Sequence, residues 1–276
     1  MTTARTMAVR GGVVFGLLAF LWLPIAFVMI HSFNRDELML RWSGFTFDWY
    51  RIALQDEAVR EGFRATAAIA ACSTAISVAL AVAGALWWRS ASRGGRRIFD
   101  GLTYARIILP EVVFATALFL FLLKVKVTLG FVTIVIGHVV WNSAYATLIV
   151  QARLVALDRS LEEAAADLGA GPWGVFRRVT FATLLPAILA AALLTFTFSF
   201  DDVVTSYFLG GPSTSPLPIV LLGLVRERVT PEVNAIGVMV MVLTLTFIGI
   251  AILLLSVRQM GSRDRRLFDV YRRMTA

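Results

Sequence analysis

Cysteine and charge are both scarce in this 276-residue chain, and each scarcity excludes a class of structure. The single cysteine, Cys72, excludes an intramolecular disulfide and a metal site built from cysteines. Charged residues make up 16% of the chain, whereas a soluble domain carries about 25%. Hydrophobic residues make up 58%, and the mean hydropathy is +0.78. So little charge cannot cover a water-facing surface, and we therefore expect a membrane protein.

The apolar residues gather in segments long enough to cross a bilayer, which takes roughly 20 helical residues. Each segment should be a helix, because lipid offers the backbone no hydrogen-bond partner. The expected fold class is all-α: a polytopic membrane helical bundle with six transmembrane helices, forming a single domain over residues 1–276. The expected spans are residues 11–32, 63–88, 102–123, 127–151, 182–208 and 233–257.

Arginine is distributed unevenly among the connections between these spans. The N-terminal tail, the connections near residues 89–97 and 153–178, and the C-terminal tail hold more arginines than the connections on the other side. The positive-inside rule then places both termini in the cytoplasm. This placement also accounts for the net charge of +8 without a nucleic-acid partner, since no basic face interleaved with aromatic residues exists. The first apolar run exceeds a signal-peptide core, so we interpret it as a retained span.

The outward connection 33–61 combines acidic residues with tryptophan, tyrosine and phenylalanine. Tryptophan and tyrosine favour the membrane interface, so this segment should lie along the outer surface. The second span is rich in alanine, serine and glycine. Small side chains allow helix backbones to approach closely, and we expect this helix to lie inside the bundle.

The connection 153–181, predicted to be cytoplasmic, has an unusual local pattern. Glutamate, alanine and leucine favour helix up to Leu168, after which Gly169 can adopt a left-handed conformation and end the helix. Pro172 suits the first turn of a second helix. A flat alanine ridge with Trp173 beside it could enter a groove on another protein. The alternative is an ordinary alanine-rich hairpin.

The pattern Glu163-Ala164-Ala165-x-x-x-Gly169 resembles the EAA loop of ABC importer permeases. The resemblance implies a type I ABC importer permease of MetI-like architecture, a multi-pass protein of the bacterial inner membrane. In that family the loop couples to the ATPase, which here implicates Glu163, Ala164, Ala165, Gly169 and Trp173. This chain departs from the family pattern where Leu-Pro is expected, because Pro186 comes four residues later.

The run FSFDDVVTSYF at residues 198–208, followed by Gly211-Pro212-Ser213, resembles the spermidine/putrescine branch of these permeases. The resemblance implies half of a polyamine pathway with a second homologous permease, two ATPase subunits and an extracytoplasmic binding protein as partners. The chain itself would bind no cofactor, and ATP and Mg²⁺ would belong to the ATPase. Related permeases for iron, thiamine and phosphonates share much of this pattern and remain alternatives.

Three carboxylates lie in or near the predicted spans, where ionised side chains are costly and usually functional. Carboxylates stabilise ammonium groups, and aromatic faces can receive them by cation–π contact. The candidates for the substrate pathway are Glu111, Asp201, Asp202, Trp141, Tyr145 and Tyr207.

Each candidate has a structural alternative. Asp201 and Asp202 could cap a short helix, Glu111 could pair with Arg106, and Trp141 could serve only packing. His138 and Asn142 share one helix face and are better interpreted as interhelical hydrogen-bonding groups than as ligands.

No P-loop, nucleophile elbow or H-E-x-x-H pattern occurs in the sequence. The chain is therefore predicted not to be an enzyme, and ATP hydrolysis would come from a partner. Two other classes compete with the importer: a secondary transporter, which would need broken or charged helices near the midplane, and a membrane-embedded enzyme, which would need clustered histidine and carboxylate residues.

Overall fold

A computed structural model describes residues 2–250 and 253, with side chains from residue 10 onward. Within that part of the chain the regular structure is helical, apart from one isolated bridge between Asn34 and Phe45. The helices are α1 Thr2–His31, α2 Asp48–Gln55, α3 Glu57–Ser90, α4 Arg93–Ile108, α5 Glu111–Lys124, α6 Phe131–Val155, α7 Ser160–Asp167, α8 Pro172–Val175, the π-helical turn η1 Phe176–Thr180, α9 Phe181–Phe200, α10 Val204–Leu209, α11 Leu217–Glu227 and a last helix, Pro231–Ile250.

The chain divides into two compact units. The first comprises residues 1–60 and 220–245, and the second comprises residues 61–219 and 246–276. The single domain expected over residues 1–276 stays a prediction. The predicted span 233–257 extends past residue 250, and of its last residues only Leu253 is described. The arginines of the C-terminal tail also lie outside the described residues.

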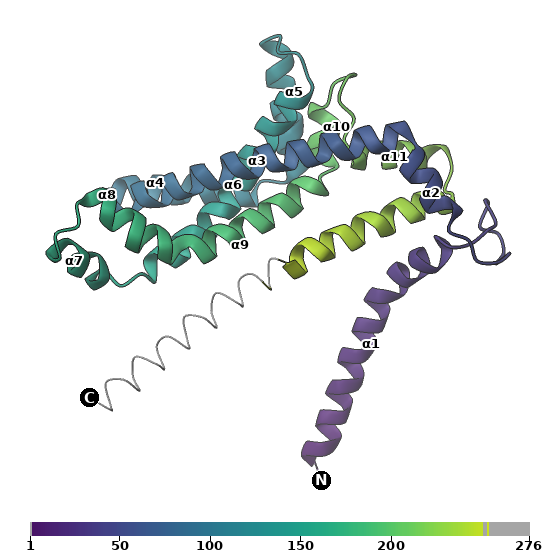
Figure 1. The fold of residues 1–276 in the computed structure, drawn as a ribbon, viewed down its shortest axis with the longest axis horizontal. Coiled ribbons are helices and arrows are strands. Elements are labelled where there is room, and N and C mark those ends of the chain that lie inside the picture. Colours follow the sequence, from purple (N-terminus) through teal and green to yellow (C-terminus); the bar gives the residue numbers. More distant parts are fainter. Residues whose placement is uncertain (1, 251–252, 254–276) are drawn as a thin grey trace. The chain divides into compact units, whose positions relative to one another are not determined.

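In the second unit, α3, α6 and α9 run alongside one another (Figure 1). Their shared core contains Ala81 and Ala85 from α3, Val150 from α6, and Leu184 and Ala191 from α9. The small residues of α3 sit at the centre of this core, so the expectation that this helix lies inside the bundle is confirmed for the second unit.

The predicted span 102–123 is not one helix. It is broken between α4 and α5, which are bent by 103°. Leu109 is extended (φ −66°, ψ 125°) because the residue before a proline is excluded from helical geometry, and Pro110 opens α5 without donating a hydrogen bond. Glu111 therefore lies at the start of α5, beside the break, whereas a single helix over the predicted span 102–123 would place it near the middle.

The predicted span 182–208 is also interrupted. The helix is continuous from Pro172 through η1 and α9 to Phe200, and it ends there. Asp202 then accepts a hydrogen bond from the backbone N–H of Ser206 over 2.8 Å and stabilises the first turn of α10. The helix thus breaks at the acidic pair, where Asp201 is exposed and the side chain of Asp202 is largely buried.

In the first unit, the connection between α1 and α2 is organised by aromatic rings and by Asn34. Phe33 packs on Phe45 and Tyr50, with ring centroids 4.8 and 5.1 Å apart. The Asn34 side chain donates to the Arg41 carbonyl and accepts from the backbone of Ser43. The segment 33–61 therefore has a defined structure with exposed aromatic residues; its place along the outer surface of the membrane stays a prediction.

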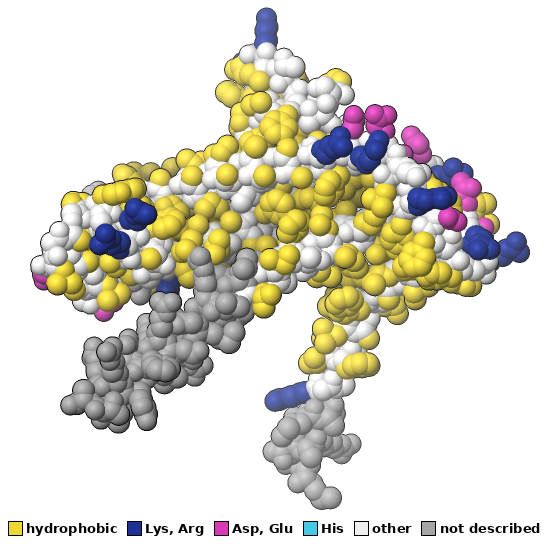
Figure 2. Space-filling view, viewed as in Figure 1, with side chains coloured by type: hydrophobic (Ala, Val, Ile, Leu, Met, Phe, Trp, Pro, Cys, Tyr) yellow, Lys and Arg dark blue, Asp and Glu magenta, His cyan; other side chains and the backbone are white. Residues whose placement is uncertain are grey.

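Five of the described helices are long and apolar enough to cross a membrane, or six if the bent pair α4–α5 counts as one span. The flanks of the long helices are covered largely by hydrophobic side chains (Figure 2). The expectation of an all-α, multi-pass membrane fold is confirmed; the side on which the termini lie stays a prediction.

Candidate functional site

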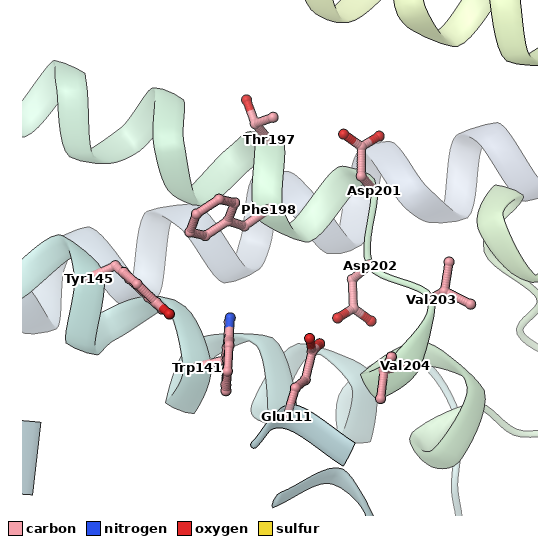
Figure 3. A pocket seen from close by; sticks show the side chains of 9 residues that line it. All are labelled: Glu111, Trp141, Tyr145, Thr197, Phe198, Asp201, Asp202, Val203 and Val204. Atoms are coloured by element: carbon pink, nitrogen blue, oxygen red, sulfur yellow. The ribbon is translucent and has the colours of Figure 1, made fainter. Parts of the chain in front are cut away.

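A pocket with a volume of about 590 Å³ opens in the second unit at the two helix breaks. It lies where α5 begins and α9 ends, with α6 along one wall (Figure 3). The lining residues are Glu111, Trp141, Tyr145, Thr197, Phe198, Asp201, Asp202, Val203 and Val204. Carboxylates and aromatic rings from three separate stretches of sequence therefore meet in one cavity.

The carboxyl groups of Glu111 and Asp202 point toward each other across this pocket (Figure 3) and are within hydrogen-bonding reach. Thr205 donates from its hydroxyl to Glu111 Oε1 over 3.3 Å. The two carboxyl groups thus face each other in one cavity, an arrangement in which both can accept hydrogen bonds from a single cationic group.

The carboxyl group of Asp202 contacts the imidazole of His138 on α6. His138 Nε2 lies 3.1 Å from Asp202 Oδ1 and 3.3 Å from the Ser206 hydroxyl, while Nδ1 lies 2.6 Å from the Ser199 hydroxyl. Ser199 in turn lies 2.9 Å from the hydroxyl of Ser73 on α3. The chain of contacts joins α3, α9, α6 and α10, and it shows His138 as the interhelical hydrogen-bonding group that we expected.

Asn142, one turn further along α6, donates to the Thr195 carbonyl over 3.3 Å and is almost fully buried. It is thus also an interhelical hydrogen-bonding group.

Arg106 does not pair with Glu111 by hydrogen bonding. Its guanidinium carbon lies 3.8 Å from the ring centroid of Trp141 and 3.9 Å from that of Phe114, and its buried nitrogens have no hydrogen-bond partner among the described residues. The two side chains lie on different helices, α4 and α5, and the pairing considered for Glu111 is not seen as a hydrogen bond or an ion pair among the described residues. Trp141 thus packs against a cation on α4 and also lines the pocket, which combines both interpretations offered for it.

The pocket contains five of the six predicted pathway residues: Glu111, Asp201, Asp202, Trp141 and Tyr145. Tyr207 does not line it; this side chain is 51% exposed on α10, and its ring packs against Phe208. Asp202 accepts from the backbone of Ser206 in the first turn of α10 and also lines the cavity; its role in the substrate pathway stays a prediction. Asp201 faces the cavity as well.

Sequence reasoning missed the residues that complete the site. Thr197 and Phe198 lie one turn before the acidic pair, and the hydroxyls of Ser199, Thr205 and Ser206 surround it. The signal available was the density of hydroxyl residues on both sides of Asp201-Asp202. Such residues favour a helix break with local hydrogen bonds over a continuous span.

The connection after α6 forms the predicted pair of short helices. Gly169 has φ +85° and ends α7, and Pro172 is the first residue of α8. None of the residues of α7 is buried; Leu168 is 89% exposed and Trp173 is 71% exposed. Glu163, Ala164 and Gly169 are exposed as well, and Ala165 is half-buried. The loop therefore has exposed apolar side chains, and its helices α7 and α8 lie at one end of the long helices of the second unit (Figure 1).

Glu162 lies beside this exposed surface and accepts hydrogen bonds from α3 and η1. Arg89 of α3 donates from Nη1 to Glu162 Oε1 over 2.9 Å and from Nη2 to Oε2, and the Thr180 hydroxyl donates to Oε1 over 2.5 Å. The hydrogen bonds from Arg89 and Thr180 lower the pKa of the Glu162 carboxyl below its ordinary value. The stabilisation is therefore present at neutral pH and is lost only as the pH falls through that lowered pKa.

The sequence profile described as "Binding-protein-dependent transport system inner membrane component" matches residues 74–268. The chain belongs to this family. Its members are transport components and not enzymes, so the chain is a multi-pass permease that works with a binding protein, and the prediction that it is not an enzyme is confirmed on this ground. A secondary transporter and a membrane-embedded enzyme are set aside by the same finding.

Two relatives show the branch of the family that the chain resembles. The putrescine transport system permease protein PotI of Escherichia coli (strain K12) is 34% identical over 229 residues, which are 80% of this chain and 82% of that protein. The spermidine/putrescine transport system permease protein PotC of Haemophilus influenzae is 32% identical over 236 residues, which are 85% of this chain and 91% of that protein.

Solved structures show that the fold is shared more widely than the sequence. A bacterial ABC transporter involved in the import of alginate superposes with a TM-score of 0.70 at 16% identity, covering 91% of this chain and 94% of that chain. The MetNI methionine ABC transporter superposes with a TM-score of 0.60 at 16% identity, covering 71% of this chain and 94% of that chain. The MetI-like architecture expected from the sequence is confirmed.

Proposed function

We propose that this permease forms half of the translocation pathway of an ATP-driven importer for polyamines. The observation that carries the proposal is the pocket in which Glu111, Asp201 and Asp202 lie beside Trp141, Tyr145 and Phe198. Two of the relatives are named for putrescine or spermidine transport. Acidic groups next to aromatic faces are what a chain of ammonium groups and methylenes requires.

The contact between Glu111 and Asp202 suggests how an ammonium group is accepted. An arriving ammonium group would lie between the two carboxyl groups and donate hydrogen bonds to both of them, so that a cation meets negative charge in a partly buried site. Methylenes of the cargo would then lie along Phe198 and Tyr145, whose rings pack at 5.3 Å between centroids. His138 would hold Asp202 in place as the ammonium group binds.

The energy would come from two ATPase subunits that dock on residues 153–181 and bind the ATP and Mg²⁺. Exposure of Leu168 and Trp173, with the exposed Glu163 and Ala164 before them on the same loop, supports this role. Such large apolar side chains on a water-facing loop indicate an interaction surface. A second homologous permease would complete the pathway.

Among the alternative cargoes, a phosphonate fits the pocket poorly, because its negative charge would meet three carboxyl groups. Within the described residues no group of three or more histidine, cysteine or carboxylate side chains could hold a metal ion, so ferric iron has no site there. Thiamine, a cation with aromatic rings, is the second candidate that the aromatic wall favours.

Ligand screening of the cognate extracytoplasmic binding protein tests the cargo. We expect putrescine or spermidine to bind at micromolar concentration or below by calorimetry, with thiamine, ferric iron and methylphosphonate as the comparison set. Binding of one of these three with no polyamine binding would refute the polyamine assignment alone. The importer assignment would survive such a result, because it depends on the family and not on the cargo.

A further inference from the structure

The ion pair between Arg89 and Glu162 joins two parts of the chain that are 73 residues apart. Its geometry is bidentate, each side chain is about one-fifth exposed, and Thr180 supplies a third hydrogen bond to the carboxylate. Forked arginine–carboxylate pairs are stronger and more directional than single ion pairs. We call these three residues the clasp.

The end of α3 that carries the clasp is itself fixed by a second arginine. Arg96 donates from Nε to the Trp88 carbonyl over 3.0 Å and from Nη2 to the Arg89 carbonyl over 2.6 Å. Its guanidinium carbon also lies 4.9 Å from the Trp88 ring centroid. These contacts satisfy carbonyl groups that a helix end leaves without partners. Arg89 therefore projects from a rigid last turn.

The middle of the same helix reaches the pocket. Ser73 contacts Ser199, Ser199 contacts His138, and His138 contacts Asp202. Between Ser73 and Arg89, α3 is uninterrupted and spans about 24 Å at 1.5 Å per residue. It packs along that length through Ala81 and Ala85 in the shared core. One uninterrupted helix thus contacts the exposed loop at its C-terminal end and, at its middle, the hydrogen-bond chain that leads to Asp202.

The polypeptide itself joins the loop only to α6 and α9, since the loop lies between them in sequence. Among the ion pairs of the described residues, Arg89–Glu162 is the pair that links α7 to α3. Movement of the loop would reach α3 through this pair and through packing, whereas α6 and α9 would move by covalent connection.

We infer that α3 is a transmission rod: the clasp passes displacement of residues 160–175 to α3, and Ser73 passes it through Ser199 and His138 to Asp202. Arg89 and Glu162 are positioning residues in this scheme, because neither touches cargo or nucleotide. The inference rests on the proposed function, in which an ATPase moves the loop. It adds which helix carries that movement to the carboxylates.

The test uses the complete transporter, with both permeases, the ATPase and the binding protein, reconstituted in liposomes. The variants are Arg89→Gln and Glu162→Gln, with the exchange variant Arg89→Glu/Glu162→Arg and Arg93→Gln, an exposed arginine nearby, as controls. Three quantities are measured: the ATPase that co-purifies, the ATP hydrolysed, and the putrescine imported per ATP.

We expect each single clasp variant to retain the ATPase within about twofold and to import about tenfold less putrescine per ATP, since coupling between sites typically spans 5- to 150-fold. The exchange variant should recover part of the loss, and Arg93→Gln should behave as the wild type. Normal import per ATP in Glu162→Gln would overturn the inference. Loss of ATPase binding in that variant would overturn it as well, by making the clasp a docking element.

A double-mutant cycle between Glu162→Gln and Ser73→Ala tests whether displacement passes along α3 from the clasp to Ser73. If both residues act along one path, the combined loss is smaller than the product of the two single losses. Losses that multiply would show that Ser73 and Glu162 act independently and would overturn the rod. If the wild-type complex neither co-purifies an ATPase nor hydrolyses ATP during import, the proposed function fails instead, and that outcome is visible before any variant is made.

Discussion

Replacing Asp202 by asparagine is expected to lower putrescine uptake at least about tenfold, a loss equivalent to about 1.4 kcal/mol of interaction with the cation. The substitution keeps the size of the side chain and removes its charge. At an effective dielectric constant of about 20, two unit charges 4 Å apart interact by about 4 kcal/mol, so a tenfold loss is a conservative expectation. Asparagine would also present an N–H group toward Glu111, where the cargo ammonium is proposed to bind.

The measurement is uptake of labelled putrescine by proteoliposomes that contain the complete transporter. Asp100→Asn is the matched control, because Asp100 is a half-buried carboxylate of α4 that lies outside the pocket and accepts from Gln151. This control should keep uptake within about twofold of the wild type. Wild-type uptake by Asp202→Asn would contradict a role of this carboxylate in the pathway.

Replacing Gly169 by valine is expected to remove most of the co-purifying ATPase. Gly169 has φ +85°, a conformation that costs residues other than glycine about 1–2 kcal/mol and costs a β-branched residue more. A Cβ atom at this position would meet nothing within 4 Å, so strain in the backbone and not collision is the cause. The turn between α7 and α8 would then change direction, and Leu168 and Trp173 would no longer face the same partner.

Gly169→Asn is the control for this prediction, because asparagine tolerates the left-handed region better than any β-branched residue does. It should retain about half or more of the ATPase that binds the wild type, measured by densitometry after affinity purification of the permease. Equal retention by the valine and asparagine variants would show that the backbone conformation at Gly169 does not govern docking.

The elements that were predictable from sequence are those whose cause is local. Each apolar span stands out because lipid demands a long helix, and the turn at Gly169-Ala170-Gly171-Pro172 follows from the conformational preferences of glycine and proline. The break at Leu109-Pro110 also has a local cause: a proline within a helical pattern ends the helix at the preceding residue. The length of the apolar run 102–123 hides this signal, because the run alone is long enough for one span.

The contacts that build the site have no local cause. His138 and Asp202 are 64 residues apart, and Arg89 and Glu162 are 73 residues apart. The sequence could identify the carboxylates as candidates, because charged residues within a span are rare. It could identify the aromatic rings, because they can receive ammonium groups by cation–π contact. It could not show that Arg106 stacks on Trp141, since this contact depends on how α4 packs against α6. It also could not show that Tyr207 lies outside the pocket, since this depends on the direction of α10 after the break.

The central claim is that residues 160–175 dock a nucleotide-hydrolysing subunit, and cross-linking tests it most directly. The single native cysteine, Cys72, can be replaced by alanine, and one new cysteine can be introduced at Leu168, whose side chain is 89% exposed. Leu40, 83% exposed in the connection predicted to face outward, provides the control position. The account predicts that Leu168→Cys forms a cross-link to the ATPase in membranes and that Leu40→Cys does not. A cross-link to the ATPase from Leu40→Cys, with none from Leu168→Cys, would contradict it.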